Sequence, residues 1–449
     1  MSVVRDRPDS SEVPRTLAEP APRTLGLVDQ LGLWGNLGVS LLGFTGAVAV
    51  LQPGGLGGPR LPLAAALLAT LVGTVLGSCA VAATAALGAR TGAPTMVLLR
   101  GLFGARASAV PTVLNIVQMV GWGTFEIVTI ATALGQVVGG VPQAVWAVCC
   151  GALTTALAVH PLGSVRLLRR YVSVAVLLAL GYLAVRLAGQ PDPHGGPTSW
   201  SGFPVAVDTT LAVAVSWVPM AADYARHSRG TRAAALGAFA GYGAMQVACY
   251  AVGLLAVVAA GGGSVFGVFL AVPLGGAAFL VVTVRELDQS FADVYSTTVS
   301  TQNLRPQWDR RVVSVAVGLL TTALALLVDV HDYASFLALI GSVFVPLSGV
   351  LVADWMCRGS AGWDLGPDAP TRWSMLLPWA AGFVVYQLVN PGQVGAWASM
   401  WHAVARTVGF TPQPWMSASL LSFLVAAAIA IPLSSTGSRR RRRGCRPGR

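Results

Sequence analysis

The chain contains 449 residues, of which 54% are hydrophobic and only 10% are charged, whereas about 25% of residues are charged in an average soluble domain. Apolar runs that are each long enough to cross a bilayer follow one another from Leu31 to Leu433. This composition excludes an ordinary soluble enzyme and predicts an all-α polytopic membrane protein.

The formal net charge of +11 comes from arginine alone, because the chain has no lysine. Seven arginines lie between Arg439 and Arg449, directly after the final apolar run. A basic segment in this place is typical of a cytoplasmic anchor beside anionic lipid, so we expect the lipid bilayer, and no nucleic acid, as its partner. The first 24 residues are polar and contain several prolines, which predicts a flexible tail rather than a signal peptide.

We predict twelve transmembrane helices with both termini in the cytoplasm. In this arrangement the outer connections and helix edges hold only Arg60, Arg186 and Arg406, and the other arginines near helix ends gather in the inner connections. Positive charge collects in cytoplasmic loops, so the pattern predicts a multi-pass protein of the cell (inner or plasma) membrane. The expected centres of the spans are Val39, Val75, Trp122, Gly151, Leu178, Val213, Gln246, Val282, Leu320, Val345, Val384 and Val425.

Two predicted spans look interrupted, five helices apart. The first, LWGNLGVSLLGFTGA, contains four glycines, and the sixth, SWVPMAADYAR, contains Pro219. Interrupted helices at matching positions indicate a transporter with inverted repeats, although glycine is also frequent in membrane helices generally. We expect a five-plus-five inverted repeat with broken helices 1 and 6, plus two C-terminal helices. The expected divisions are an N-terminal tail (1–25), a first repeat (26–190), a second repeat (200–357), helices 11 and 12 (370–434) and a basic tail (435–449).

Polar residues follow one face of the predicted third helix. Ionisable side chains inside a membrane are costly and therefore indicate function or a paired structural role. A planar heterocycle could stack on Trp122 while its ring NH or amino groups donate to Glu126 and its carbonyl accepts from an amide. The alternative is a polar seam that packs helices together. The face comprises Asn115, Gln118, Trp122, Glu126 and Thr129.

The predicted eighth helix carries Arg285, Glu286, Asp288 and Asp293 within nine residues. Glu286 and Asp293 are seven residues apart and share a helical face, whereas Arg285 and Asp288 can pair. A carboxylate in a low-dielectric cavity gains proton affinity and can take a proton from one side of the membrane to the other. The alternative is the end of a helix in water, with solvated charges.

The sequence contains no pattern typical of an enzyme or of a resident metal or cofactor. Its five histidines are dispersed without metal-ligand spacing, it has no GxxxxGK[ST] loop for nucleotide phosphates, and no nucleophile–base arrangement stands out. We therefore expect neither enzymatic activity nor a cofactor.

Six ordered motifs resemble the nucleobase–cation symporter-1 family, the permeases for cytosine and purines, uracil, thiamine and allantoin. The resemblance runs from Leu31 to Trp355. It is carried by LWGNLGVSLLGF, GARTGAPTMVLLRGLFG, NIVQMVGWGTFE, SWVPMAADYARHSRG, FADVYSTTVSTQNLRP and LALIGSVFVPLSGVLVADW.

The resemblance implies secondary active import of a nucleobase-like heterocycle, driven by sodium or protons, with the substrate between helices 1, 3, 6 and 8. Trp122 is similar to the family's stacking residue on helix 3, and Glu126, one turn on, is similar to its hydrogen-bonding partner, where some relatives have an amide. Ser216 and Trp217 match its second stacking region, and Asp293 stands where many relatives have Asn.

On helix 8 this sequence departs from sodium-dependent members, which have small hydroxyl residues where it has Leu287 and Asp288. We therefore expect proton coupling through Glu286, Asp288 and Asp293. Cytosine or a purine is the expected substrate; hydroxymethylpyrimidine or another thiamine-related heterocycle is the alternative. A receptor that binds such a ligand without moving it is a second alternative.

Overall fold

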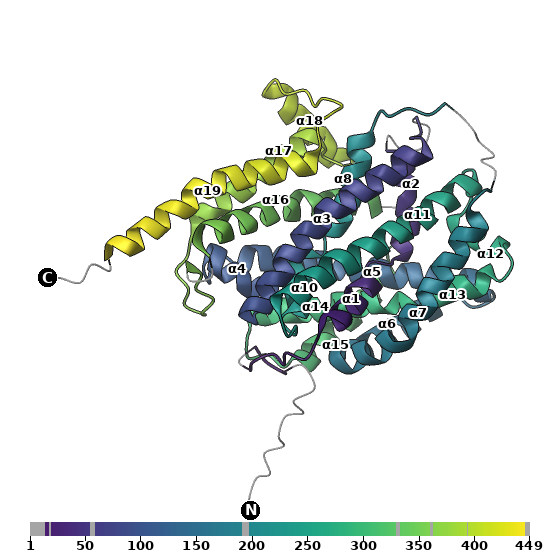
Figure 1. The fold of residues 1–449 in the computed structure, drawn as a ribbon, viewed down its shortest axis with the longest axis horizontal. Helices are drawn as coiled ribbons and strands as arrows, with labels where there is room; N and C mark the ends of the chain where they lie inside the picture. The colour runs from purple at the N-terminus through teal and green to yellow at the C-terminus, as the bar shows by residue number, and fades with distance from the viewer. Residues whose placement is uncertain are drawn as a thin grey trace, which may run out of the picture.

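The computed structural model describes residues 14–17, 19–53, 59–190, 197–328, 333–359, 362–392 and 394–444. These residues are helical or irregular, apart from two isolated β-bridges that pair Leu25 with Ser228 and Arg60 with Thr198. The helices of the first half (Figure 1) are α1 (Leu27–Leu37), α2 (Leu41–Leu51), α3 (Leu63–Thr91), α4 (Thr95–Phe103), α5 (Ala109–Val138), α6 (Gln143–Val159) and α7 (Pro161–Leu187).

The second half begins with α8 and runs to a long C-terminal helix. Its helices are α8 (Phe203–Val215), α9 (Val218–Ala225), α10 (Thr231–Leu236), η1 (Gly237–Tyr242), α11 (Gly243–Ala260), α12 (Val265–Ala271), α13 (Gly275–Arg285), α14 (Leu287–Leu304), α15 (Arg310–Ala325), α16 (Tyr333–Arg358), η4 (Trp373–Met375), α17 (Leu376–Val389), α18 (Gly395–Thr407) and α19 (Ala418–Gly444).

Six helical stretches of the described residues are long and apolar enough to cross a membrane, and the bent pair of α1 and α2 can form a seventh. Three shorter apolar helices accompany them. The prediction of an all-α polytopic membrane protein is therefore confirmed, while the count of twelve spans stays a prediction. The six stretches are Leu63–Thr91, Ala109–Val138, Phe203–Ala225, Thr231–Ala260, Phe336–Arg358 and Ala418–Ser435.

The helices pack in groups that combine both halves of the chain. Helices α17 and α19 pack with α16 along one side of the molecule, and α5, α6, α14 and α15 pack together on another. Helix α3 packs against α8 and α9, and α11 packs against α2 (Figure 1). Elements from both halves of the chain thus surround the centre.

Both expected helix breaks are present. Helices α1 and α2 meet at an angle of 61° around Gly38, Val39 and Ser40. A Cβ atom on Gly38 would lie 2.5 Å from the carbonyl oxygen of Tyr242, so glycine allows the break to pack directly on the neighbouring helix. Helices α8 and α9 are separated by Ser216 and Trp217, just before Pro219.

A single-residue irregularity at Glu286, which the sequence did not predict, separates α13 from α14, and the backbone there keeps helical dihedral angles. It lies within the charged stretch of the eighth predicted span. The side chains of Arg285 and Glu286 are fully buried and those of Asp288 and Asp293 are 5% exposed. The alternative of solvated charges at a helix end is therefore wrong.

Candidate substrate-binding site

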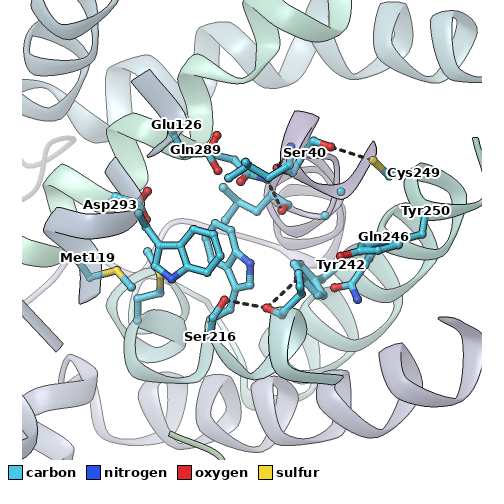
Figure 2. A pocket seen from close by; sticks show the side chains of 18 residues that line it. Ser40, Met119, Glu126, Ser216, Tyr242, Gln246, Cys249, Tyr250, Gln289 and Asp293 are labelled. Carbon is cyan, nitrogen blue, oxygen red and sulfur yellow. Dashed lines mark hydrogen bonds between the residues drawn. The ribbon is translucent and has the colours of Figure 1, made fainter. Parts of the chain in front are cut away.

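A narrow cavity lies beside the breaks in α1–α2 and α8–α9. Figure 2 shows side chains from several helices converging on it, with Ser40, Glu126 and Gln289 on one side and Gln246 and Tyr250 on another. It is lined by Leu37, Gly38, Ser40, Leu42, Gly43, Met119, Trp122, Glu126, Val213, Ser216, Trp217, Met220, Tyr242, Gln246, Cys249, Tyr250, Gln289 and Asp293.

Two indole rings that line the cavity are held by other aromatic rings. The ring centroid of Trp122 lies 5.2 Å from that of Phe336 on α16, at 70°. Trp217 lies 5.9 Å from Tyr242 and 6.4 Å from Trp34, edge to face with the latter. Such contacts fix the ring planes, so both indoles are pre-positioned to stack on a flat ligand.

The π-helical turn η1 places Tyr242 in the cavity wall. Its hydroxyl group donates to the carbonyl oxygen of Val213 at 3.4 Å, next to the break of α8. π-Helical turns often occur at functional sites. Here the turn packs against α1, where Gly241 lets the two backbones approach, since a Cβ atom there would lie 2.7 Å from the carbonyl oxygen of Leu31.

The polar groups of the cavity are mainly acceptors. Glu126 is 2% exposed, and its Oε2 has no hydrogen-bond partner among the described residues. Gln246 Nε2 donates to Thr74 Oγ1 and the carbonyl oxygen of Thr210, both at 2.9 Å, which leaves its Oε1 without a partner within the described part of the chain. The carboxyl group of Asp293 adds a further acceptor to the wall.

Gln289 also presents its amide oxygen, because its nitrogen is already used. Gln289 Nε2 donates to the carbonyl oxygens of Leu37 at 2.9 Å and Val39 at 2.5 Å, in the break of the first span. A ligand in this cavity therefore meets aromatic faces and acceptor oxygens.

An ion pair lies behind this wall. Arg285 Nη1 is 3.1 Å from Glu286 Oε2. Glu286 does not line the cavity itself, but its Oε1 accepts from Ser40 Oγ, which does. Asp288 is buried and likewise stands outside the lining.

Five of the six substrate-site residues predicted from the sequence line the cavity: Trp122, Glu126, Ser216, Trp217 and Asp293. Gln118 does not. Its Nε2 donates to Asn115 Oδ1 at 2.9 Å, and Asn115 Nδ2 donates to Ser300 Oγ at 2.8 Å. The part of the polar face of α5 around Asn115 and Gln118 therefore packs helices together, and the part around Trp122 and Glu126 lines the cavity.

Several lining residues were missed by the sequence analysis. Ser40 and Gln289 could have been found as polar residues inside apolar spans. Tyr242 and Gln246 carry a weaker signal, since their place depends on the π-helical turn and on the packing of α11 against the first span.

Broken membrane helices around a buried, aromatic and polar cavity define a membrane transport protein. The chain belongs to the family of permeases for cytosine/purines, uracil, thiamine and allantoin, whose model matches residues 32–362. The family resemblance of the six motifs is thereby confirmed, and the protein is a transport protein rather than an enzyme. No curated protein matches the chain significantly.

Solved transporter structures share the fold. Mhp1, a nucleobase-cation-symport-1 family transporter, in a closed conformation with bromovinylhydantoin bound, aligns with a TM-score of 0.73 at 16% identity, covering 97% of this chain and 96% of that one. Inward-facing Mhp1 gives 0.64 at 15% identity, covering 99% and 96%. A Na⁺-coupled sialic acid symporter in a substrate-bound outward-open state gives 0.62 at 11% identity, covering 92% and 90%.

Proposed function

We propose that this protein imports a nucleobase, cytosine or a purine first, by proton symport with alternating access. The observation that carries the proposal is the joint presence of two braced indoles, Trp122 and Trp217, and two carboxyl groups, Glu126 and Asp293, around one buried cavity. Any base can stack on an indole, because every base has a π-face. The carboxyl groups can then distinguish bases by the hydrogen-bond donors along the edge of the ring.

The donor and acceptor pattern favours bases that carry amino or ring NH groups. The open positions at the cavity are acceptors: Glu126 Oε2, Gln246 Oε1 and the amide oxygen of Gln289. A ligand carbonyl opposed to such oxygens leaves buried polar groups unsatisfied, at a cost of about 1 to 3 kcal/mol each. Cytosine, adenine and aminopyrimidines such as hydroxymethylpyrimidine fit this pattern better than uracil.

The balance of buried charges supports a proton as the coupling ion. Glu126, Glu286 and Asp293 are buried, and Arg285 pairs with Glu286. Further negative charges on Glu126 and Asp293 would be costly in a low-dielectric interior, and bound protons remove that cost. Loading and release of such a proton can accompany the change of access.

For the membrane arrangement we propose twelve spans in the cell membrane with both termini in the cytoplasm. The first repeat would occupy residues 26–190, the second 200–357 and the two added helices 370–434. The clustering of arginine in alternate connections supports this topology.

Uptake into vesicles tests the function directly. Vesicles containing the protein should accumulate labelled cytosine or adenine, and the label should be displaced by bases that share the substrate's amino edge. A panel that includes uracil and hydroxymethylpyrimidine identifies the substrate. Saturable binding with no accumulation, under any ion gradient, would identify a receptor and contradict the proposal.

A further inference from the structure

The break in the first span leaves a set of backbone carbonyl groups without their usual helical partners. Helix α1 ends at Leu37, and the last carbonyl groups of any helix lack an intrahelical donor. In transporters with broken helices, carbonyl groups of this kind coordinate the driving Na⁺ ion. The partners of these carbonyl groups therefore bear on which ion this protein can use.

In this protein the carbonyl groups are occupied by side chains of the eighth span. Arg285 donates through Nη1 to the carbonyl oxygen of Val39 and through Nη2 to that of Asn36. Gln289 donates to the carbonyl oxygens of Leu37 and Val39. A guanidinium offers only donors and keeps its charge, so it supplies here the positive charge that a metal ion would bring.

Glu286 completes the arrangement by joining the other half of the break. Its Oε2 pairs with Arg285, while its Oε1 accepts from Ser40 Oγ at 2.8 Å and from the backbone N–H of Leu41 at 3.0 Å. Leu41 is the first residue of α2, so the carboxylate lies at the positive end of that helix. The adjacent pair Arg285 and Glu286 therefore satisfies the carbonyl end of α1 and the N–H end of α2 together.

We propose that the guanidinium of Arg285 is a tethered cation that takes the place of a sodium ion at the break of the first span, so that the protein binds no sodium there and transports without it. A second cation at these carbonyl groups would lie against a fixed positive charge that has little screening by water, which is unfavourable. Sodium also needs oxygen ligands, and Arg285 and Gln289 already occupy those of this break.

The test measures sodium binding without any transport. Purified wild-type protein should have the same melting temperature in sodium chloride as in choline chloride at equal concentration, and should show no saturable binding of radioactive sodium. A ligand that binds the folded state raises its stability by mass action. Saturable sodium binding together with a sodium-specific rise in melting temperature in the wild type would overturn the proposal.

Two arginine variants test whether Arg285 is the residue that prevents sodium binding. Arg285→Ala frees the carbonyl oxygen of Asn36, leaves that of Val39 with Gln289 alone and leaves Glu286 to balance a new cation, so its melting temperature should become sodium-dependent. Arg310 is the matched control, because it is also fully buried and donates to the backbone carbonyl oxygens of Ala158 and Val159, at 3.0 and 3.1 Å. Arg310→Ala should lose stability without gaining a sodium response.

A folded Arg285→Ala protein whose melting temperature does not respond to sodium would contradict the proposal. If that variant does not fold, the sodium-binding and melting-temperature measurements on the wild type decide between the two possibilities. Replacing sodium by choline should also leave wild-type uptake unchanged. This uptake measurement alone rests on the proposed transport function: a protein that moves no base would refute that function and leave the binding result standing.

Discussion

Ser40, in the break of the first span, donates through its Oγ to Glu286 Oε1 at 2.8 Å. Ser40 and Glu126 both line the ligand cavity. Glu286 is also bound to Arg285 and to the start of α2. The contact therefore joins the wall of the ligand cavity to the buried ion pair of the eighth span.

The buried carboxyl groups of the cavity wall, Glu126 and Asp293, predict that a pH gradient drives uptake. An inwardly directed proton gradient, acidic outside, should accelerate uptake of labelled cytosine into de-energised vesicles, because substrate and proton enter together. A protonophore should abolish the acceleration. A response to a sodium gradient at fixed pH, with none to a pH gradient, would contradict both proposals: proton coupling, and Arg285 as a tethered cation in place of sodium.

Replacement of Glu126 by glutamine should change the preference between bases. The carboxylate favours an amino or NH edge, whereas the amide of Glu126→Gln offers both a donor and an acceptor. The preference for cytosine over uracil should therefore narrow, by an amount that reflects the cost of about 1 to 3 kcal/mol for an unsatisfied buried acceptor. The measurement is the ratio of inhibition constants for the two bases in the wild type and the variant.

Gln118→Glu supplies a control for that experiment, because Gln118 lies on the same helix but outside the cavity lining. It adds a carboxyl group to the packing seam and should leave the ratio unchanged. An unchanged ratio in Glu126→Gln, with transport intact, would place Glu126 outside the binding site.

The broken helices of the fold could be predicted because their causes are local. Pro219 and the glycines of the first span interrupt helices by backbone geometry, and the breaks lie where these residues stand. The irregularity at Glu286 has no such residue beside it. The contacts of Arg285 there are made with carbonyl groups of a segment about 250 positions away in the sequence, which no local pattern reveals.

The aromatic and acidic part of the site could also be predicted, because an indole or a carboxyl group in a membrane span is unusual by itself. The different roles of Gln118 and Trp122 on α5 could not be predicted. Gln118 and Trp122 share one helical face, yet Gln118 faces a packing seam and Trp122 lines the cavity. Only the positions of α14 and α16 decide which residue meets a ligand.

Removal of the indole of Trp122 should abolish uptake. Stacking of a base on an aromatic side chain contributes about 1 to 3 kcal/mol, so Trp122→Ala should lose saturable uptake at ordinary substrate concentrations, whereas Trp122→Phe should keep part of it. Trp379→Phe is the matched control, because Trp379 is equally buried but lies outside the cavity lining, against Phe103. Unchanged apparent affinity in Trp122→Ala would show that the indole only fills space.

The last prediction concerns His227, which lies just after α9 and outside the predicted spans. Its Nδ1 lies 3.0 Å from the carbonyl oxygen of Pro22, while the N–H of Leu25 donates to the carbonyl oxygen of His227 and the N–H of Arg229 donates to that of Leu25. Burial lowers the pKa of His227 from 6.5 to about 3, with a further contribution from the positive charge of Arg226. The neutral ring thus helps to hold the N-terminal segment against the start of the following span.

Because the pKa is lower in the folded state, the unfolded chain binds one more proton than the folded chain between these two values. Stability should therefore fall as the pH drops below 6.5, by up to about 1.4 kcal/mol per pH unit from this group. Above that pH the contribution is constant. His227→Gln keeps a donor for Pro22 but cannot titrate, so its melting temperature should decline less steeply with acid than that of the wild type.

Ser228→Ala separates titration from simple loss of contact. Ser228 Oγ donates to the carbonyl oxygens of Leu25 and Gly230, at 3.5 and 3.0 Å, and carries no titratable group. This variant should lower the melting temperature by the same amount at every pH. If His227→Gln and the wild type lose stability with acid in parallel, the buried neutral histidine is not the source of the acid sensitivity, and other groups that bind more protons in the unfolded chain must account for it.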